Sequence, residues 1–229
     1  MNWLVKFFKS SIGQKLIMSL TGLFLCSFLL VHCAGNTLLF KGDGGMSFNY
    51  YGEFMSKNPV IKTIAYGLYA MILVHAFKGL TLAWANRKAR GEVSYAVANG
   101  KSAVPFSKQM AILGSIIFIF IGIHMSHFWY SVQIGAVPHV EYTFDGHTES
   151  VENLYASVAE AFKKEWIVAL YVLSCVALAF HLIHGFQSAF QTLGLNHKKY
   201  TPIIKGLGYV FSIVVCLAFA AMPIFFYLK

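Results

Sequence analysis

Long uncharged, apolar stretches alternate with short polar segments along the whole chain. Between Lys15 and Lys41 lie 25 residues without a charge, whereas about 20 apolar residues cross the hydrocarbon core of a bilayer. Four comparable stretches follow, one of which is interrupted only by Lys78. The pattern predicts five transmembrane helices, at residues 15–39, 62–86, 109–133, 166–191 and 206–227.

This pattern is typical of an all-α membrane protein whose helices form one bundle, and we expect residues 1–229 to be a single domain. The one long polar segment covers residues 134–165. Within it, Ser150 is a candidate N-cap for a short helix at 150–163 whose apolar residues fall on one face. Such a helix is expected to lie along the bilayer surface.

The composition supports a membrane protein and the charge distribution predicts its orientation. The chain is 57% hydrophobic but only 12% charged, so the class of ordinary soluble enzymes is excluded. The net charge is +9. Most basic residues lie in the segments on one side of the predicted spans, and most acidic residues lie in the segments on the other side. The positive-inside rule then predicts a cytoplasmic N-terminus and an outer C-terminus, and it leaves no reason to expect a nucleic-acid partner. The basic side includes Lys6, Lys9, Lys15, Arg87, Lys88, Arg90, Lys101, Lys108, Lys198, Lys199 and Lys205, with Glu92 as its one acid.

Six of the nine histidines fall inside the predicted spans. They are His32, His75, His124, His127, His181 and His184. Ionisable residues within a membrane are rare and suggest a functional site by default. A single one could be a neutral imidazole that hydrogen-bonds two helices, but four helices that each carry at least one histidine favour a shared role.

The depth of these histidines sorts them into two layers. At about 1.5 Å per residue, His32 and His127 lie about 25–27 Å along helices that run outwards. By the same rise, His75 lies about 20 Å from the outer end of its helix and His181 about 24 Å along its own. The layers are therefore His32 with His127 towards the outside and His75 with His181 towards the inside.

Two layers with two imidazoles each suit two stacked haems that have bis-histidine ligation. Each haem needs one imidazole on either face, hence one from each of two helices. The chain has no CxxCH motif, so such haems would be non-covalent and of b type. A non-haem di-iron site is the competing interpretation, but it would need the histidines in one place. Depth alone does not choose between His124 and His127, or between His181 and His184.

At these residues the sequence resembles a known family, the five-helix, di-haem cytochrome b membrane anchor of bacterial succinate dehydrogenases and fumarate reductases. The matching stretches occur in the family's order and at similar spacing over most of the chain. They are His32-Cys-Ala-Gly-Asn36, Phe48-Asn49 through Phe54-Met55 and Pro59, His75-Ala-Phe-Lys-Gly79, His127-Phe-Trp129, and His181-Leu-Ile-His-Gly185 with Ser188 and Thr192-Leu-Gly194.

The resemblance implies a ligand set for the two haem irons. His32 and His127 would bind the outer haem, and His75 and His181 the inner haem. His124 and His184 depart from the family pattern as extra histidines one turn away, where they could hydrogen-bond propionates or helices, or replace a ligand.

The resemblance also implies a function and partners. The chain would be the electron-transfer membrane subunit of a succinate:quinone oxidoreductase in the bacterial cytoplasmic membrane, with menaquinone as the expected quinone. Flavoprotein and iron–sulfur subunits would dock on the cytoplasmic face, and succinate chemistry would take place in the flavoprotein. Quinone reduction consumes two protons, and Glu53, beside Tyr50 and Tyr51, is the candidate proton relay.

Two alternatives come from other classes of membrane protein. One is the quinone-reactive di-haem cytochrome b of a hydrogenase or formate dehydrogenase, which would share the intramembrane histidine ligands. The other is a haem-free transporter or scaffold, although the sequence has no matched Gly/Pro breaks in two halves.

Overall fold

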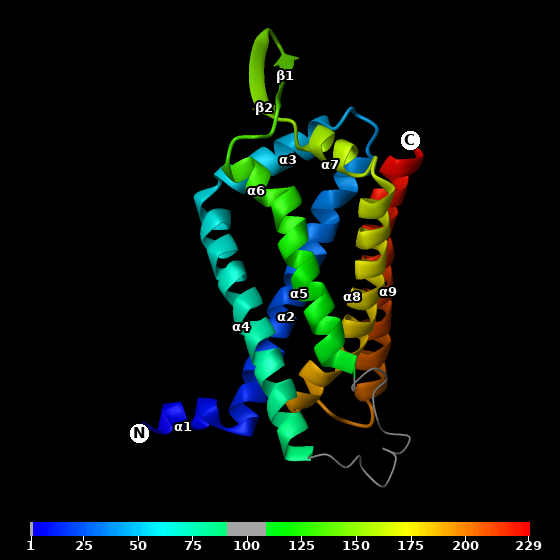
Figure 1. The fold of residues 1–229 in the computed structure, drawn as a ribbon. Coiled ribbons are helices and arrows are strands. Elements are labelled where there is room, and N and C mark those ends of the chain that lie inside the picture. Colours follow the sequence, from blue (N-terminus) through cyan, green and yellow to red (C-terminus); the bar gives the residue numbers. More distant parts are fainter. Residues whose placement is uncertain (1, 91–108) are drawn as a thin grey trace. The chain divides into compact units, whose positions relative to one another are not determined.

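The computed structural model describes residues 2–90 and 109–229, and Figure 1 traces their helices and strands. They divide into two compact units. Unit 1 comprises Met1–Ser27, Leu68–Phe118 and Ala177–Val214, and unit 2 comprises Phe28–Gly67, Ile119–Val176 and Val215–Lys229. Each long helix contributes residues to both units. The predicted basic residues Lys101 and Lys108 and the acid Glu92 lie outside the described residues.

Five helices are long and apolar enough to span a membrane, which confirms the number and the approximate positions of the predicted spans. They are α2 (Ser11–Asn36), α4 (Pro59–Arg90), α5 (Met110–His127), α8 (Glu165–Thr192) and α9 (Thr201–Leu228). Two of the spans are extended by short helices, η1 (Thr37–Phe40) after α2 and α6 (Trp129–Gln133) after α5. A short helix α1 (Trp3–Lys9) precedes α2.

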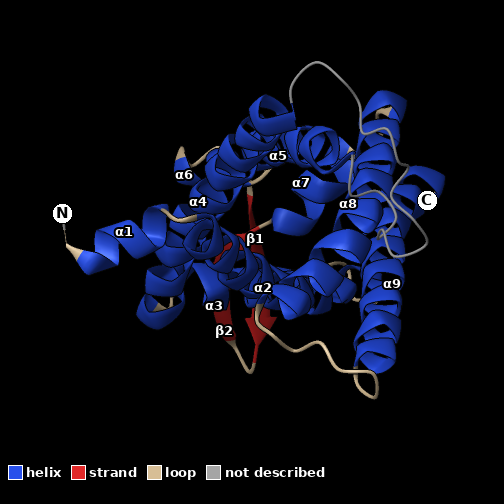
Figure 2. Cartoon of the chain, turned by 90° about the horizontal axis from the view of Figure 1, so that it is seen from below, coloured by secondary structure: helices blue, strands red, loops and turns tan. Residues whose placement is uncertain are grey.

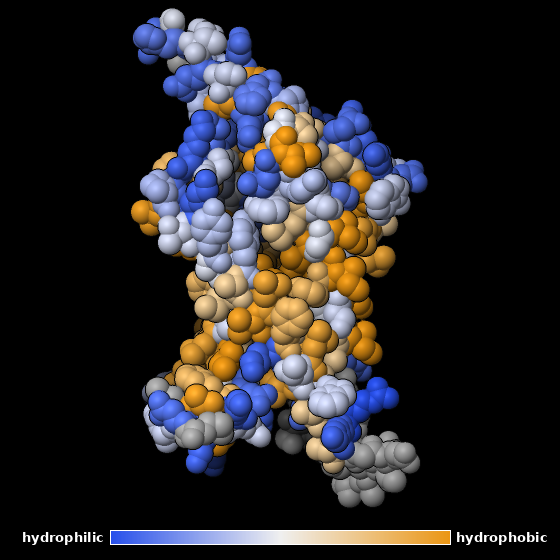
Figure 3. Space-filling view, turned by 60° about the vertical axis from the view of Figure 1, so that its left-hand side comes forward, coloured by the Kyte–Doolittle hydropathy of each residue, from blue (hydrophilic) through white to orange (hydrophobic). Residues whose placement is uncertain are grey.

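Much of the surface of these helices is apolar. The face in Figure 3 carries large contiguous areas of hydrophobic side chains. Exposed examples are Ile119 on α5, Leu173 on α8 and Leu217 on α9. A protein surrounded by water rarely exposes contiguous apolar patches of this extent, so lipid is the natural solvent for these faces.

A β-hairpin that the sequence analysis did not predict occupies part of the polar segment 134–165. Strand β1 (His139–Phe144) pairs antiparallel with β2 (His147–Glu152), and Figure 2 shows both in red. The two turn residues, Asp145 and Gly146, have φ of 48° and 80°. Positive φ at both positions is the geometry of the tight hairpin turns for which Asp-Gly is a preferred sequence.

The short helix predicted at 150–163 exists, but it begins later. Helix α7 covers Leu154–Ala161, and its N-cap is Asn153, whose side chain accepts a hydrogen bond from the amide of Ala156. Ser150, the predicted cap, lies in β2 opposite Glu141. The predicted N-cap was therefore wrong, because the backbone groups of the residues before Asn153 form their hydrogen bonds within the hairpin.

A second unpredicted element, helix α3 (Met46–Lys57), lies beside α7 in unit 2. Before its first turn, the Asp43 carboxylate accepts hydrogen bonds from the amides of Gly45 and Ser47, at 3.1 Å each. Hydrogen bonding to Ser47 holds the pKa of Asp43 below its ordinary value. Gly45 has φ of 89°, and a Cβ there would collide with the ring of Tyr155 on α7. Only glycine suits this close approach.

The side chain of Asn49 joins α3 to the hairpin and to α7, and it is fully buried. Its amide nitrogen donates to the hydroxyl of Tyr142 at 3.0 Å and to the side-chain oxygen of Asn153 at 3.3 Å. Its oxygen accepts from the backbone amide of Tyr155 at 2.9 Å. The group formed by α3, the hairpin and α7 is called the cap below, and Asn49 is its centre.

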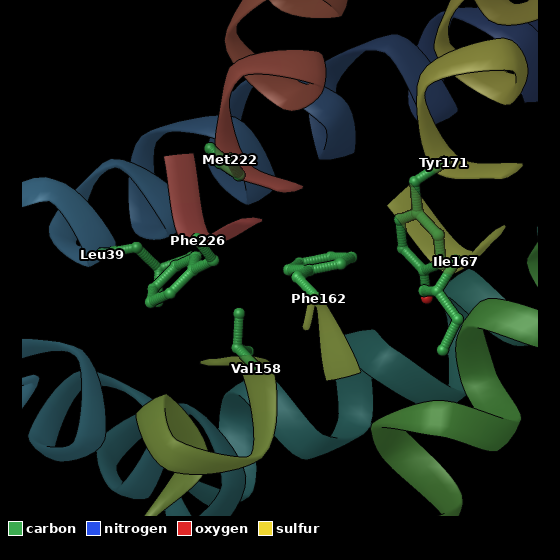
Figure 4. Close-up of a cluster of buried hydrophobic side chains, with 7 residues drawn as sticks. All are labelled: Leu39, Val158, Phe162, Ile167, Tyr171, Met222 and Phe226. Carbon is green, nitrogen blue, oxygen red and sulfur yellow. The ribbon is translucent and has the colours of Figure 1, made fainter. Parts of the chain in front are cut away.

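Beneath the cap, unit 2 has a hydrophobic cluster that includes residues of η1, α7, α8 and α9. Figure 4 shows its seven buried members, which are Leu39, Val158, Phe162, Ile167, Tyr171, Met222 and Phe226. The rings of Phe162 and Tyr171 pack edge to face at 5.0 Å. Burying each large side chain contributes roughly 1.5–3 kcal/mol, so this cluster anchors the cap to the ends of the spans.

Unit 1 is built almost wholly from helix-to-helix packing. Gly208 on α9 lies against the ring of Phe186 on α8. A Cβ at Gly208 would lie 2.9 Å from Cδ1 of Phe186. Phe186 also packs on Phe211 at 5.7 Å. Between α4 and α5, the rings of Phe77 and Phe118 lie 6.3 Å apart. Small residues that let helices approach closely are typical of packing in membranes.

Candidate functional site

The six histidines of the spans divide equally between the two units. His75, His181 and His184 belong to unit 1, and His32, His124 and His127 to unit 2. The histidines thus form two separate groups of side chains, each of which can be described within its own unit.

In unit 1, His75 on α4 and His181 on α8 face each other. Their ring centroids are 6.2 Å apart, and the ring planes are inclined by 71°. The pair is the one predicted for the inner layer. His184 lies one turn along α8, and its Nδ1 and that of His181 are buried and have no hydrogen-bond partner among the described residues.

The hydroxyl of Thr21 on α2 lies beside the ring of His75. It lies 2.7 Å from the carbonyl of Ile17, to which it can donate, and 3.0 Å from Nδ1 of His75. A hydroxyl whose one hydrogen goes to the Ile17 carbonyl accepts from the imidazole. In that arrangement the His75 hydrogen is on Nδ1, and the lone pair on Nε2 is available to bind a metal.

Each histidine of this pair lies close to a glycine on another helix. A Cβ at Gly22 on α2 would lie 3.3 Å from Cε1 of His75. A Cβ at Gly114 on α5 would lie 3.6 Å from Cε1 of His181. The two contacts are equivalent, because in each case the glycine lies on one span and the histidine lies on the span that follows it in the sequence.

In unit 2, His32 on α2 lies beside the ring of His124 on α5. The two ring centroids are 5.9 Å apart and the planes are nearly perpendicular, at 84°. On its own helix, His32 has a polar neighbour in Asn36, whose amide nitrogen donates to the His32 carbonyl at 2.7 Å and lies 3.4 Å from Nδ1. His124 was the histidine of this helix that the resemblance did not favour.

Aromatic rings surround the second pair. Phe28 stacks on His32 at 5.2 Å and Phe219 lies 5.5 Å from the same ring. Rings also surround His124 at 5.5–5.9 Å, and these belong to Phe120, Phe128 and Tyr171. Close neighbours of His75 and His181 in unit 1 are the Thr21 hydroxyl and the two glycines Gly22 and Gly114.

His127 has a different environment from His124, although both are on α5. Its ring stacks on that of Tyr171 at 6.1 Å and 7°, and it lies edge-on to Trp166 at 6.5 Å. Its Nδ1 is 3.2 Å from the Tyr171 hydroxyl. Trp166 is an exposed residue at the start of α8. His127 thus lies between Tyr171 and the exposed end of α8.

The spacing along the chain independently relates His124 to His32. Gly22 precedes His32 by ten positions, and Gly114 precedes His124 by ten positions. Since Gly22 and Gly114 make equivalent contacts with His75 and His181, α2 with α4 corresponds to α5 with α8. In this internal repeat the counterpart of His32 is His124, and His127 is an addition one turn further on.

The two ring pairs fit the ligation of one metal ion each. Neutral imidazole is the commonest protein ligand of metals, and each pair brings together two imidazoles from two different helices. Their ring centroids are 6.2 and 5.9 Å apart. Within residues 2–90 and 109–229, no group of three or more His, Cys, Asp or Glu could hold a metal ion.

Glu53, the candidate proton relay, lies on α3 in unit 2. Its carboxylate forms an ion pair with Lys57 one turn along the helix, and its side chain is 20% exposed. Hydrogen bonding to Glu53 raises the pKa of Lys57. Tyr51, which the sequence analysis placed beside it, packs against Gly35 at the end of α2. The side chain of Glu53 is therefore partly shielded and lies against a cation.

Comparisons with family models, with curated proteins and with solved structures gave no match to this chain.

Proposed function

We propose that the chain is a di-haem cytochrome b, the membrane anchor subunit of a succinate:quinone oxidoreductase of the bacterial cytoplasmic membrane. The observation that carries the proposal is the pair of cross-helix histidine contacts, one in each unit, with ring spacings of 6.2 and 5.9 Å. Both lie within helices that are long and apolar enough to span a membrane. The ordered motifs around these histidines support the family assignment.

His75 and His181 would hold one haem and His32 and His124 the other. The second pair differs from the one implied by the resemblance, which favours His127. Ring placement and the ten-residue spacing from Gly114 both support His124. His127 has Tyr171 and Trp166 as neighbours instead.

A haem held by two imidazoles supplies reversible one-electron transfer, at a potential that its ligands and surroundings set. The residues of this chain would orient the imidazoles and exclude water from them. In unit 1, the Thr21 hydroxyl would favour the His75 tautomer with its hydrogen on Nδ1. In unit 2, Phe28 stacks on His32 and keeps solvent from one face of that ring.

The proposal places partner subunits at the basic segments. Flavoprotein and iron–sulfur subunits would dock on the cytoplasmic side, where the positive-inside rule puts the N-terminus and the bases that follow α4 and α8. Lys198, Lys199 and Lys205 are among these bases. Quinone, expected to be menaquinone, would react near the His32 and His124 pair.

The reduced-minus-oxidised spectrum of the purified full chain tests the central claim. We expect two b-type haems per polypeptide, by the pyridine haemochrome assay and by the spectrum. Purified chain without haem, even after haem-supplemented expression, would overturn the proposal.

The role of Glu53 is tested by Glu53→Gln in membranes that contain the assembled complex. We expect quinone reduction to fall at least tenfold while both haem spectra stay normal, because the amide cannot carry a proton. Lys57→Gln is the matched control, since it breaks the same ion pair but keeps the carboxylate. Equal losses in both variants would assign the effect to the ion pair, and normal turnover in Glu53→Gln would exclude Glu53 as the relay.

A further inference from the structure

Tyr171 on α8 bridges the two histidines of α5. Its hydroxyl lies 3.2 Å from Nδ1 of His127 and 3.4 Å from Nδ1 of His124. The side chain is buried, with only 6% of the residue exposed. One hydroxyl is thus shared between the histidine that faces His32 and the histidine that lies beside Trp166.

The packing around Tyr171 holds its ring in place. Phe120 and Phe162 meet the ring edge to face at 4.9 and 5.0 Å. Figure 4 shows Tyr171 and Phe162 in the buried cluster beneath the cap. These two rings hold the Tyr171 ring, and with it the hydroxyl, in place.

If His124 binds a metal through Nε2, the donor and the acceptor of each hydrogen bond made by Tyr171 are determined. A neutral imidazole that binds through Nε2 carries its hydrogen on Nδ1, and that N–H needs an acceptor. The oxygen of Tyr171 is the acceptor within reach of His124. The single hydroxyl hydrogen of Tyr171 then points to Nδ1 of His127, which must be unprotonated to accept it. The hydrogen of His127 is consequently on Nε2.

We propose that Tyr171 is a positioning residue that selects His124 as the ligand and tunes the potential of the haem at His32 and His124. This inference rests on the proposed function. By accepting the Nδ1 hydrogen of His124, the Tyr171 oxygen orients the ring and makes the imidazole a stronger electron donor. By donating to His127, the same hydroxyl holds that ring in the tautomer whose Nε2 lone pair is unavailable to iron.

The other pair has an equivalent device of a different kind. There, the Thr21 hydroxyl lies 3.0 Å from Nδ1 of His75 and 2.7 Å from the Ile17 carbonyl of its own helix. Thr21 and Tyr171 lie beside different histidine pairs, so the two haems can be tuned separately.

Tyr171→Phe in the purified holoprotein tests the inference by potentiometric titration of the haem absorbance. The ring and its packing are retained, so we expect two haems per chain. Without an acceptor for its N–H, His124 donates less charge to the iron, so the reduced form is favoured and one midpoint potential rises. We expect a change of about tenfold in the reduction equilibrium, which corresponds to about 59 mV for one electron. The second potential should not move.

Three variants control this experiment. Tyr142→Phe removes another hydroxyl from unit 2, one that accepts from Asn49, and should leave both potentials unchanged. Thr21→Val should raise only the potential that Tyr171→Phe leaves unchanged. His127→Phe removes the acceptor of the Tyr171 hydroxyl and should give a smaller rise in the same haem as Tyr171→Phe, which keeps the test available if Tyr171→Phe does not fold.

The outcomes separate the inference from the proposed function. Two haems with unchanged potentials in both Tyr171→Phe and His127→Phe overturn the inference and leave the proposed function intact. A wild-type chain that purifies without haem overturns the proposed function itself. A shift in the electron paramagnetic resonance signal of one haem in Tyr171→Phe supports the inference, since this substitution keeps the ring and its packing and removes only the hydroxyl.

Discussion

The two histidine pairs have nearly equal ring spacings but very different neighbours. His75 and His181 lie in unit 1 beside a threonine and two glycines, whereas His32 and His124 lie in unit 2 among aromatic rings. One region brings backbone close to the imidazoles, and the other surrounds them with large apolar side chains. Two histidine pairs of similar ring spacing thus lie in two distinct environments.

The difference bears on the electron affinity of the two proposed haems. Ligand identity is the same at both sites, so any difference in potential must come from burial, hydrogen bonding and nearby charge. Polar neighbours such as the Thr21 hydroxyl and the nearby peptide groups act on the first pair, while apolar aromatic rings dominate around the second. Haems bound at the two pairs would therefore be expected to have different midpoint potentials.

The largest expected effect comes from removing one ligand from each region. His181→Ala and His32→Ala should each lower the haem content by about half, and the two variants should lose different haems. Separate loss is expected because each ligand pair lies within one unit. Difference spectra with redox titration identify the remaining haem. Loss of both haems in either variant would show that the two regions are not independent.

A second comparison distinguishes the two histidines of α5. His124→Ala should lose the same haem as His32→Ala, whereas His127→Ala should keep both, because only His124 lies beside His32. Haem content per purified chain measures the result. The reverse pattern would restore the ligand set implied by the resemblance and contradict the ring placement.

The stability of unit 2 should depend on the cap. Asn49→Ala removes three buried hydrogen bonds and leaves the Tyr155 amide unpaired, at a cost of about 3 kcal/mol in the free energy of unfolding. Asn58→Ala is the matched control. It removes the half-buried N-cap of α4 and should cost about 1 kcal/mol. In a thermal melt followed by haem absorbance, Asn49→Ala should release the haem of unit 2 first. Simultaneous release of both haems would contradict this dependence.

The smallest effect is expected at the two glycines of unit 1. A Cβ at Gly22 would lie 3.3 Å from His75, which its bond to Thr21 holds in place, so Gly22→Ala should weaken haem retention slightly. Gly114→Ala places its Cβ at an ordinary 3.6 Å from His181 and gains helix propensity of up to about 1 kcal/mol. Detergent melting temperatures should therefore fall for the first variant and stay equal or rise for the second. The opposite order would mean that contact distance does not govern these positions.

The spans were predictable because the thickness of the bilayer sets the length of a spanning helix, and the length of an apolar run can be counted in the sequence. The hairpin also had a local signal, Asp145-Gly146 between two alternating segments, which the expected surface helix obscured. The cap was not predictable in this way. Asn49 is polar and lies in a segment without a strong period, and its partners Tyr142 and Asn153 lie 93 and 104 positions away.

The candidate site was predictable in its residues but only partly in its pairing. Depth placed His75 with His181, which the structure also places together. Depth could not distinguish His124 from His127, since they differ by less than one turn and α5 is apolar on all sides. The rotation of such a helix about its axis is set by tertiary packing. Tyr171 and Thr21 were missed for the same reason, although the position of Thr21 directly before Gly22 was a usable signal.

The burial of Asn49 has a consequence for the biosynthesis of the chain. Its last partner, Tyr155, follows it by 106 residues, and ribosomes add about 5–20 residues per second. Helix α3 must therefore remain for roughly 5–20 s without the side chains that later enclose it. During that interval its asparagine is solvated, and the first two spans can be inserted before the region above them is locked. The hydrogen bonds of Asn49 that close the cap thus form late in synthesis, and a chain truncated before Tyr142 could not form them.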